Sequence, residues 1–312
     1  VYEDRVRDVS WEFLNVGLRL AREGDRFQLE ARADAPAELA NRIDVSAQGG
    51  LTVLEEDSED WRVVAELRDL DLSALQVLIP DGEGMPRSGV GDISVWLDFN
   101  RGRLEQATAQ LTLEDLQLAD NPGLLVAEST YENLVGTMEW SRQADGWQIA
   151  LSNVNLRRQN RSWPSGVIVD LQITENEDAQ DSFRLKSSFL RLEDLTPFIL
   201  ALPQNFFTES WMAFSPRGDL LELGFGWDGG ADTLTYSAAA NFRDIGVSAN
   251  GQWPGVTGLS GELRADSRSG RMALSTRNAQ FDWQAIFRQP LDIEEMIGAL
   301  IWRQGQDGIR LV

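Results

Sequence analysis

Acidic residues and tryptophans are the side chains with which this sequence could do chemistry. Two carboxylate pairs, Glu55 with Glu56 and Asp69 with Asp71, stand in a chain that also has 11 tryptophans. A carbohydrate-binding or carbohydrate-active protein would use such groups, because paired carboxylates act as acid and base and tryptophan rings stack on sugars. Both pairs also have a plainer interpretation as turn or solvated-edge residues. Carbohydrate recognition is therefore the second hypothesis for function.

Composition and missing motifs exclude several kinds of site. The chain has no cysteine and no histidine, so it cannot form disulfides, thiolate or imidazole zinc sites, or a triad with an imidazole base. No phosphate-binding loop, dinucleotide fingerprint or serine-nucleophile motif occurs. With 28 basic and 50 acidic residues the net charge is −22, which opposes binding to nucleic-acid phosphates. We expect no enzyme activity, no catalytic residue, no metal, no cofactor and no nucleic-acid partner.

The segment around which the chain is organised occurs twice. Residues 67–80 align without a gap on residues 190–203, and each copy contains an Asp-Leu pair and ends in proline. Each copy follows a run of alternating apolar residues and precedes a Gly-Asp-aliphatic strand, at 91–99 and 218–227. Further matches downstream keep the same offset of about 125 residues, which indicates a repeated structural unit.

This offset predicts the domain organisation. We expect residues 1–60 to be the end of a preceding repeat and residues 61–182 to form one β-groove repeat. Residues 183–312 would form another repeat, truncated at its end. The chain as a whole is expected to be an internal piece of a longer protein.

Alternation of apolar and polar residues predicts about sixteen strands joined by tight turns, which is typical of an antiparallel meander. The alternation slips at Asp115 and again before Val154 and Leu156, as it does at a β-bulge. The strand-rich pattern therefore favours one large antiparallel sheet.

Helices are expected to be few and short. Proline and capping patterns predict three helices, at 35–41, at 72–80 and at 194–203. Apolar spacing suggests two more, at 205–214 and 291–300. No run of 18 apolar residues occurs, so no segment is expected to span a bilayer. The short helices could cover the ends of the sheet but not its whole apolar face.

Such a sheet has one apolar face that something must cover. It could pack on a second sheet as a sandwich, as in a structural adhesin, close into a barrel, or curl into an open trough. Linear repeats favour the trough, because each unit touches only its neighbours. In a trough the apolar face would hold long acyl chains, each methylene contributing about 0.8 kcal/mol.

The residues expected to line this groove share one strand parity. They are Trp61, Val63, Leu67, Ile93, Val95, Leu97, Phe99, Leu111, Leu113, Met138, Trp140, Ile149, Leu151, Val167, Val169, Leu171, Phe183, Leu185, Leu221, Leu223, Phe225, Leu234, Tyr236, Leu263, Met272 and Leu274. The predicted fold is thus mainly β: a long curled antiparallel sheet that forms an open hydrophobic groove, or β-taco, with a few short helices.

These motifs resemble one known family. The Asp-Leu-x-x-Leu/Phe segment with its terminal proline, the Gly-Asp-aliphatic strand, and residues 254–264 are similar to the YhdP proteins, AsmA-like proteins of the Gram-negative envelope. The resemblance covers roughly residues 10–310, without the N-terminal membrane anchor or the C-terminal AsmA portion of that family.

The resemblance implies a function. It implies a monomeric periplasmic segment of a lipid-transfer bridge, anchored in the inner membrane in the full-length protein. Such a bridge would carry phospholipid or another acyl-chain lipid between the inner and outer membranes, and its ends would meet both membranes. The family offers no catalytic residue to assign to this chain.

Overall fold

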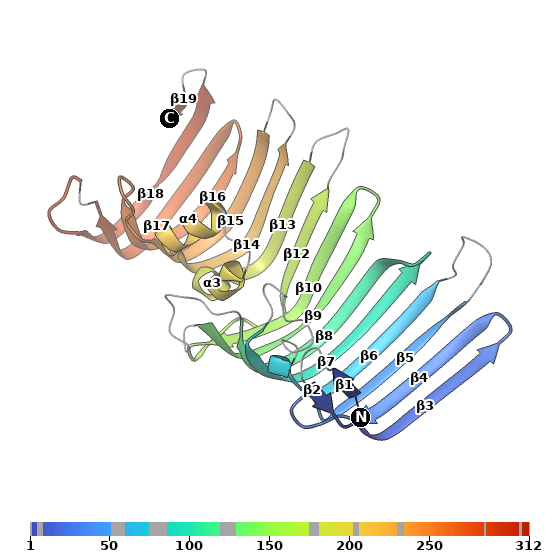
Figure 1. Ribbon diagram of the computed structural model, residues 1–312. Coiled ribbons are helices and arrows are strands. Elements are labelled where there is room, and N and C mark those ends of the chain that lie inside the picture. The colour runs from blue at the N-terminus through green and yellow to red at the C-terminus, as the bar shows by residue number, and fades with distance from the viewer. Residues whose placement is uncertain are drawn as a thin grey trace. The chain divides into compact units, whose positions relative to one another are not determined.

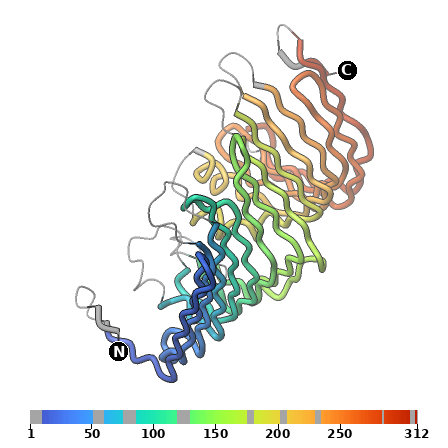
Figure 2. The backbone as a smooth tube through the Cα atoms, turned by 90° about the vertical axis from the view of Figure 1, so that its right-hand side faces the viewer, coloured from blue at the N-terminus to red at the C-terminus, as the bar shows by residue number. Residues whose placement is uncertain are grey.

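The computed structural model describes residues 2–4, 9–50, 60–74, 86–118, 129–174, 181–201, 206–229, 234–283, 285–305 and 308–311. The chain divides into two compact units, Val1–Gly166 and Val167–Val312, called unit 1 and unit 2 below. Each unit is described by itself. Figure 1 shows the strands of each unit side by side in chain order, and Figure 2 shows that the strands within each unit form a curved layer.

The described residues of unit 1 lie mostly in strands. Its elements are β1 (Tyr2–Asp4), β2 (Val9–Trp11), β3 (Leu14–Glu23), β4 (Arg26–Asp34), β5 (Arg42–Gly50), β6 (Trp61–Asp71), the 3₁₀ turn η1 (Leu72–Ala74), β7 (Ser88–Asn100), β8 (Arg103–Gln117), β9 (Thr130–Gln143), β10 (Gly146–Arg158) and β11 (Arg161–Ser162). Strands β1 and β2 pair only with each other in the described part.

The described residues of unit 2 form strands and two helices. Its elements are β12 (Val167–Thr174), β13 (Asp181–Arg191), α3 (Leu192–Leu200), α4 (Phe206–Phe214), β14 (Arg217–Gly229), β15 (Leu234–Val247), β16 (Gly255–Asp266), β17 (Ser269–Asp282), β18 (Leu291–Gly305) and β19 (Gly308–Leu311).

The sheet in each unit is antiparallel and open. From β3 to β10 and from β12 to β19, consecutive strands pair with one another. In the described registers β3 pairs only with β4, and Leu18 on β3 is 73% exposed, as expected of an edge strand. The predicted open antiparallel sheet is therefore confirmed, and within its described residues neither unit forms a sandwich or a closed barrel.

The strands of each sheet end along two opposite sides, which we call edges, and the two edges differ. The edge with the tight turns between strands is called the hairpin edge. An example of such a turn is Arg101-Gly102, where both residues have positive φ (49° and 71°), as a type I′ turn requires. The opposite edge, called the cap edge, carries η1 and residues 35–41 in unit 1 and α3 and α4 in unit 2.

Helix predictions had mixed outcomes. Helices α3 and α4 confirm the segments expected at 194–203 and 205–214. Residues 35–41 make a turn closed by hydrogen bonds to Pro36 O rather than a helix. The helix expected at 291–300 is wrong, because this segment lies in β18 and pairs along its length with β17.

The helix predicted at 72–80 is described only at its start. There η1 covers Leu72–Ala74, and the rest of the segment lies outside the described residues.

The buried core lies at the cap edge. In unit 1 the fully buried residues gather where the strands meet η1 and the turn at 35–41. They include Leu39, Leu70, Leu72, Leu113, Leu116, Tyr131, Leu156 and Trp163. In unit 2 Phe189, Leu190 and Ile199 are buried where α3 packs on β13 and β14. The rest of the sheet has no comparable core among the described residues.

Two bulges recur at matching places in the two units. Asp115 and Asp244 have φ values of 50° and 53°, and Asn153 and Asn278 have φ values of 53° and 58°. Register shifts accompany all four. An extra residue in one strand bends the sheet and reverses the alternation. The recurrence supports the proposed repeat of about 125 residues.

Candidate functional site

The predicted groove residues of unit 1 form rows across the sheet. One row runs Val63, Leu97, Ala107, Trp140, Ile149 from β6 to β10, and the next runs Ala65, Val95, Ala109, Met138, Leu151. A third row contains Leu67, Ile93, Leu111 and Gly136. Residues directly opposite one another project to the same face. The register therefore places these side chains on one continuous apolar face.

This face is neither buried nor fully open to solvent. Every residue in the three rows is partly exposed, whereas Leu113, farther toward the cap edge, is only 5% exposed. Among the described elements, the substantial contacts outside neighbouring strands are those of η1 with β7 and of α3 with β13, β14 and α4. A sheet face of this size without a second layer in the described part is what an extended apolar ligand requires.

Unit 2 has an equivalent face. Leu171, Leu185, Phe225, Ala238 and Ala265 form one row across β12 to β16. A neighbouring row contains Ile173, Phe183, Trp227 and Tyr236. A third contains Ala240, Leu263, Met272 and Leu300. Ser187 on β13 lies between Val169 on β12 and Leu223 on β14, and each of these two residues is directly opposite it.

Leu274 lies on the same face as Met272, two residues before it, and opposite Gly261. Two predicted residues have other placements. Val167 is buried at the start of β12. Leu221 lies opposite Phe189 and Asn241, and a register shift at Glu222 (φ 51°) places Leu220, not Leu221, opposite Phe242. The bulge thus interrupts the expected alternation of Leu221 with Leu223. Leu234 lies opposite Gly229, and its side chain is outside the described part.

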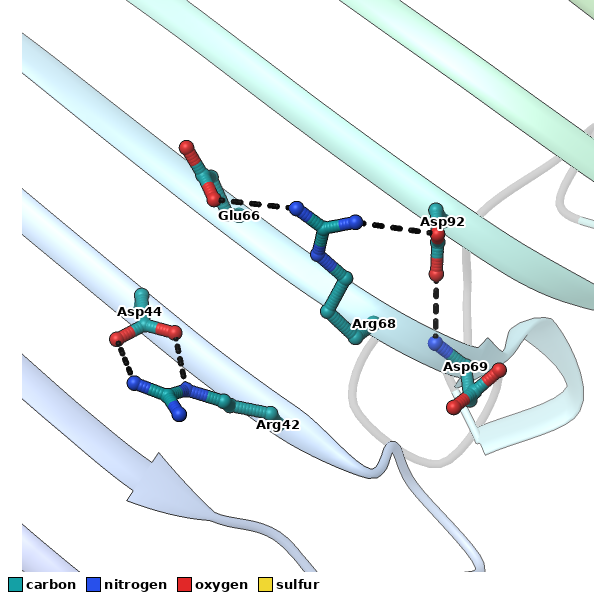
Figure 3. A network of polar contacts seen from close by, with 6 residues as sticks. All are labelled: Arg42, Asp44, Glu66, Arg68, Asp69 and Asp92. Carbon is teal, nitrogen blue, oxygen red and sulfur yellow. Dashed lines mark hydrogen bonds and ion pairs between the residues drawn. The ribbon is translucent and has the colours of Figure 1, made fainter.

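The opposite face of unit 1 is polar. Arg68 on β6 lies 3.7 Å from the Glu66 carboxylate and 3.4 Å from that of Asp92 on β7. Asp92 also accepts a hydrogen bond of 3.0 Å from the backbone N–H of Asp69, as Figure 3 shows. Such exposed pairs contribute little to stability but keep this face soluble. The two faces of one sheet therefore offer very different surfaces.

The comparison with protein families decides the identity of this chain. A family model described as YhdP protein matches residues 7–312. The chain belongs to the YhdP family. The resemblance read from the sequence motifs is confirmed, and the open β-sheet with one apolar face is the structure of this segment of a YhdP-family protein.

One relative of known description is the intermembrane phospholipid transporter YhdP of Escherichia coli (strain K12). It is 24% identical over 188 residues, which cover 56% of this chain and 14% of that protein. This chain therefore matches only a small part of its YhdP relative. No solved structure matches. Within the described residues, no helix has the length and apolar character needed to cross a membrane.

In this YhdP-family chain the apolar face also extends over β3, β4 and β5. The rows continue from Val63 to Ala47, Leu29 and Leu20, and from Ala65 to Val45, Ala31 and Leu18. The predicted site omitted these strands, although the same alternation of apolar residues was present in the sequence. The face is wider than the motif-based prediction.

The carboxylates proposed for carbohydrate chemistry have structural contacts. Asp69 sits in a positive-φ position and accepts a hydrogen bond from the Asn41 side-chain amide, at 3.3 Å. Asp71 accepts a bond of 2.9 Å from the backbone N–H of Ser73 at η1. Glu55 and Glu56 lie outside the described residues. In the ranges that the structure describes, no group of three or more acidic residues could hold a metal ion.

Asp44 on the polar face provides a pH-dependent prediction. A hydrogen bond of 2.6 Å from Arg42 lowers the pKa of the Asp44 carboxyl, and the nearby charges of Arg42, Arg32 and Arg68 lower it further against the effect of burial. Arg42→Ala should therefore raise the pKa of Asp44, as a carboxyl ¹³C titration by NMR would measure.

The lowered pKa of Asp44 also determines how the stability of the protein changes with pH. A carboxyl with a lowered pKa in the folded state stabilises the protein above its unfolded pKa, and this contribution is lost as the pH falls through the folded pKa. The contribution is small because the Arg42–Asp44 pair is largely exposed. Arg62→Ala, which removes the partner of Asp98, is the control. An unchanged pKa of Asp44 in Arg42→Ala would contradict the assignment.

Proposed function

We propose that this chain is a non-enzymatic lipid-transfer segment whose apolar face carries the acyl chains of phospholipids. In the full-length protein it would form part of a periplasmic bridge between the inner and outer membranes, anchored in the inner membrane. The observation that carries the proposal is the set of partly exposed apolar rows on an open sheet. The name of the E. coli relative, an intermembrane phospholipid transporter, supports the same substrate class.

The chemistry of the face fits an acyl chain better than a polar ligand. The three rows of unit 1 contain no charged side chain between the hairpin edge and the cap edge. Each acyl methylene removed from water there contributes about 0.8 kcal/mol. Contact of this kind depends on area rather than on a specific pocket, so a lipid could move along the rows without breaking strong polar bonds. Transfer needs no covalent step and no catalytic residue.

The repeat explains how such a face could be extended. The three proposed segments, 1–60, 61–182 and 183–312, would each supply further strands of the same kind. An open sheet can grow in this way, whereas a closed barrel cannot. The monomer is the expected form, because the face would then remain available to lipid.

Lipid extraction tests the proposal directly. Protein purified without detergent is expected to carry phospholipid, which organic extraction and mass spectrometry would identify. Delipidated protein should take up phosphatidylethanolamine and phosphatidylglycerol again from vesicles of those two lipids. Protein that is free of lipid and takes up none from vesicles would contradict the proposed function.

A further inference from the structure

Aromatic side chains mark the hairpin edge of the apolar face in unit 1. Phe27 on β4, Trp61 on β6 and Phe99 on β7 belong to one row, in which Gly49 separates Phe27 from Trp61. Trp147 on β10 lies opposite Arg142 on β9, close to the turn that joins these two strands. The Trp61 ring lies over Gly49, since a Cβ atom there would be 2.3 Å from Trp61 Cδ2. All four aromatic side chains remain partly exposed.

The hairpin edge of unit 2 has the same character. Phe183, Trp227 and Tyr236 lie opposite one another across β13, β14 and β15. On β18, Trp302 lies over Gly270, where an added Cβ atom would be 2.0 Å from the Trp302 ring. Two separate units thus place aromatic rings at the same edge and on the same face.

Side-chain type changes across the face of unit 1 from this edge to the other. The middle rows contain valine, leucine and alanine as their commonest residues, as at Val63, Ala65 and Ala109. At the cap edge Tyr131 and Trp163 are buried and cannot meet a ligand. A bilayer leaflet has the same order, with aromatic residues at the headgroup level and aliphatic residues beside the acyl chains.

Two arginines occupy the apolar side of the hairpin edge in unit 1. Arg22 lies opposite Phe27 with its guanidinium carbon 5.2 Å from the ring centroid. The Arg22 guanidinium also donates a hydrogen bond of 2.8 Å to Gly24 O and lies 3.8 Å from the exposed carboxylate of Asp25. The Arg142 guanidinium donates a hydrogen bond of 3.4 Å to Leu104 O and has no ion-pair partner among the described residues. A guanidinium has five N–H donors, so each arginine keeps donors beyond these contacts for a lipid phosphate, which arginine binds well.

We infer that the hairpin edge is the headgroup edge of the apolar face. Phospholipids would lie with their phosphates beside Arg22 and Arg142, their glycerol backbones at the aromatic rings, and their acyl chains directed toward the cap edge. This inference rests on the proposed function and adds to it an orientation for the bound lipid. It also makes Arg22 and Arg142 positioning residues that favour lipids with a phosphate.

Depth-dependent quenching tests the orientation. The chain has no cysteine, so a single cysteine can carry a bimane fluorophore at a chosen depth on the apolar face. Leu104→Cys reports the hairpin edge, Ala109→Cys the middle, and Leu134→Cys the cap edge, with Gln110→Cys on the polar face as the control. Each labelled protein is loaded with phosphatidylcholine that carries either TEMPO on the headgroup or doxyl near the end of an acyl chain.

The expected pattern is graded. Headgroup TEMPO should quench the Leu104→Cys label most, terminal doxyl should quench the Leu134→Cys label most, and neither should quench the Gln110→Cys label. The reverse order, or equal quenching at the three depths, would overturn the orientation and leave lipid binding itself intact. Absence of quenching at every position would contradict the proposed function instead.

A competition experiment tests the two arginines. In the double variant Arg22→Gln/Arg142→Gln, the ratio of the affinity for phosphatidylglycerol to that for diacylglycerol should fall roughly tenfold. The reason is that charge-assisted bonding to the phosphate is lost at the hairpin edge. Arg62→Gln on the polar face should keep the preference of the unmodified chain. An unchanged preference in the double variant would remove both arginines from headgroup binding.

Discussion

Ala109→Asp is expected to remove most of the phospholipid that the chain binds, whereas Gln110→Asp, one residue along the same strand, should leave lipid loading unchanged. Ala109 lies in the middle of the apolar rows, opposite Val95 and Met138. Gln110 projects to the polar face, opposite Ser94 and Thr137. The two substitutions add the same charge to neighbouring positions of β8, so only the face differs.

The magnitude follows from the methylenes that a carboxylate would exclude. A charged group remains hydrated, and if it keeps about four methylenes from the face, the loss is about 3 kcal/mol, or roughly a hundredfold in affinity. Lipid per protein would be measured by extraction and mass spectrometry, and far-UV circular dichroism would show that both variants are folded. Equal loading of the two variants would mean that lipid does not contact this face.

The strand pattern was largely predictable because alternation alone determines which face a residue occupies. The rows that contain Val63, Val95 and Met138 follow from parity, and the parity slip at Asp115 was visible before the structure. The slip at Glu222 was not predicted, since Leu220, Leu221 and Leu223 are all leucine and no parity can be read through them.

Segments without a clear period were predicted less well. The segment at 291–300 mixes acidic and apolar residues at spacings that suit a helix, but nine register pairs with β17 hold it as a strand. Tertiary pairing overrides weak local preference in such a segment. The aromatic and arginine positions at the hairpin edge needed the cross-strand register, because residues such as Phe27 and Trp61 are far apart in the sequence.

Arg191→Met is expected to cause the largest loss of stability in unit 2. The Arg191 guanidinium lies 2.9 Å from Asp219 and 3.7 Å from Asp194, and all three side chains are largely buried where β13 leads into α3. Removing one member of a buried ion pair leaves uncompensated charges and costs about 3–5 kcal/mol. The free energy of unfolding of unit 2 should fall by that amount in urea titrations, and amides of α3 should exchange faster.

Arg184→Met is the matched control, because Arg184 lies on the same strand and pairs with Asp228 at 3.0 Å, but both side chains are about half exposed. An exposed pair contributes about 1 kcal/mol or less. If Arg191→Met loses no more than Arg184→Met, then packing of Pro197 and Ile199, rather than charge, holds α3 on the sheet. Combining Arg191→Met with Asp219→Leu should recover part of the loss, since it also removes the carboxylate that lies 2.9 Å from Arg191.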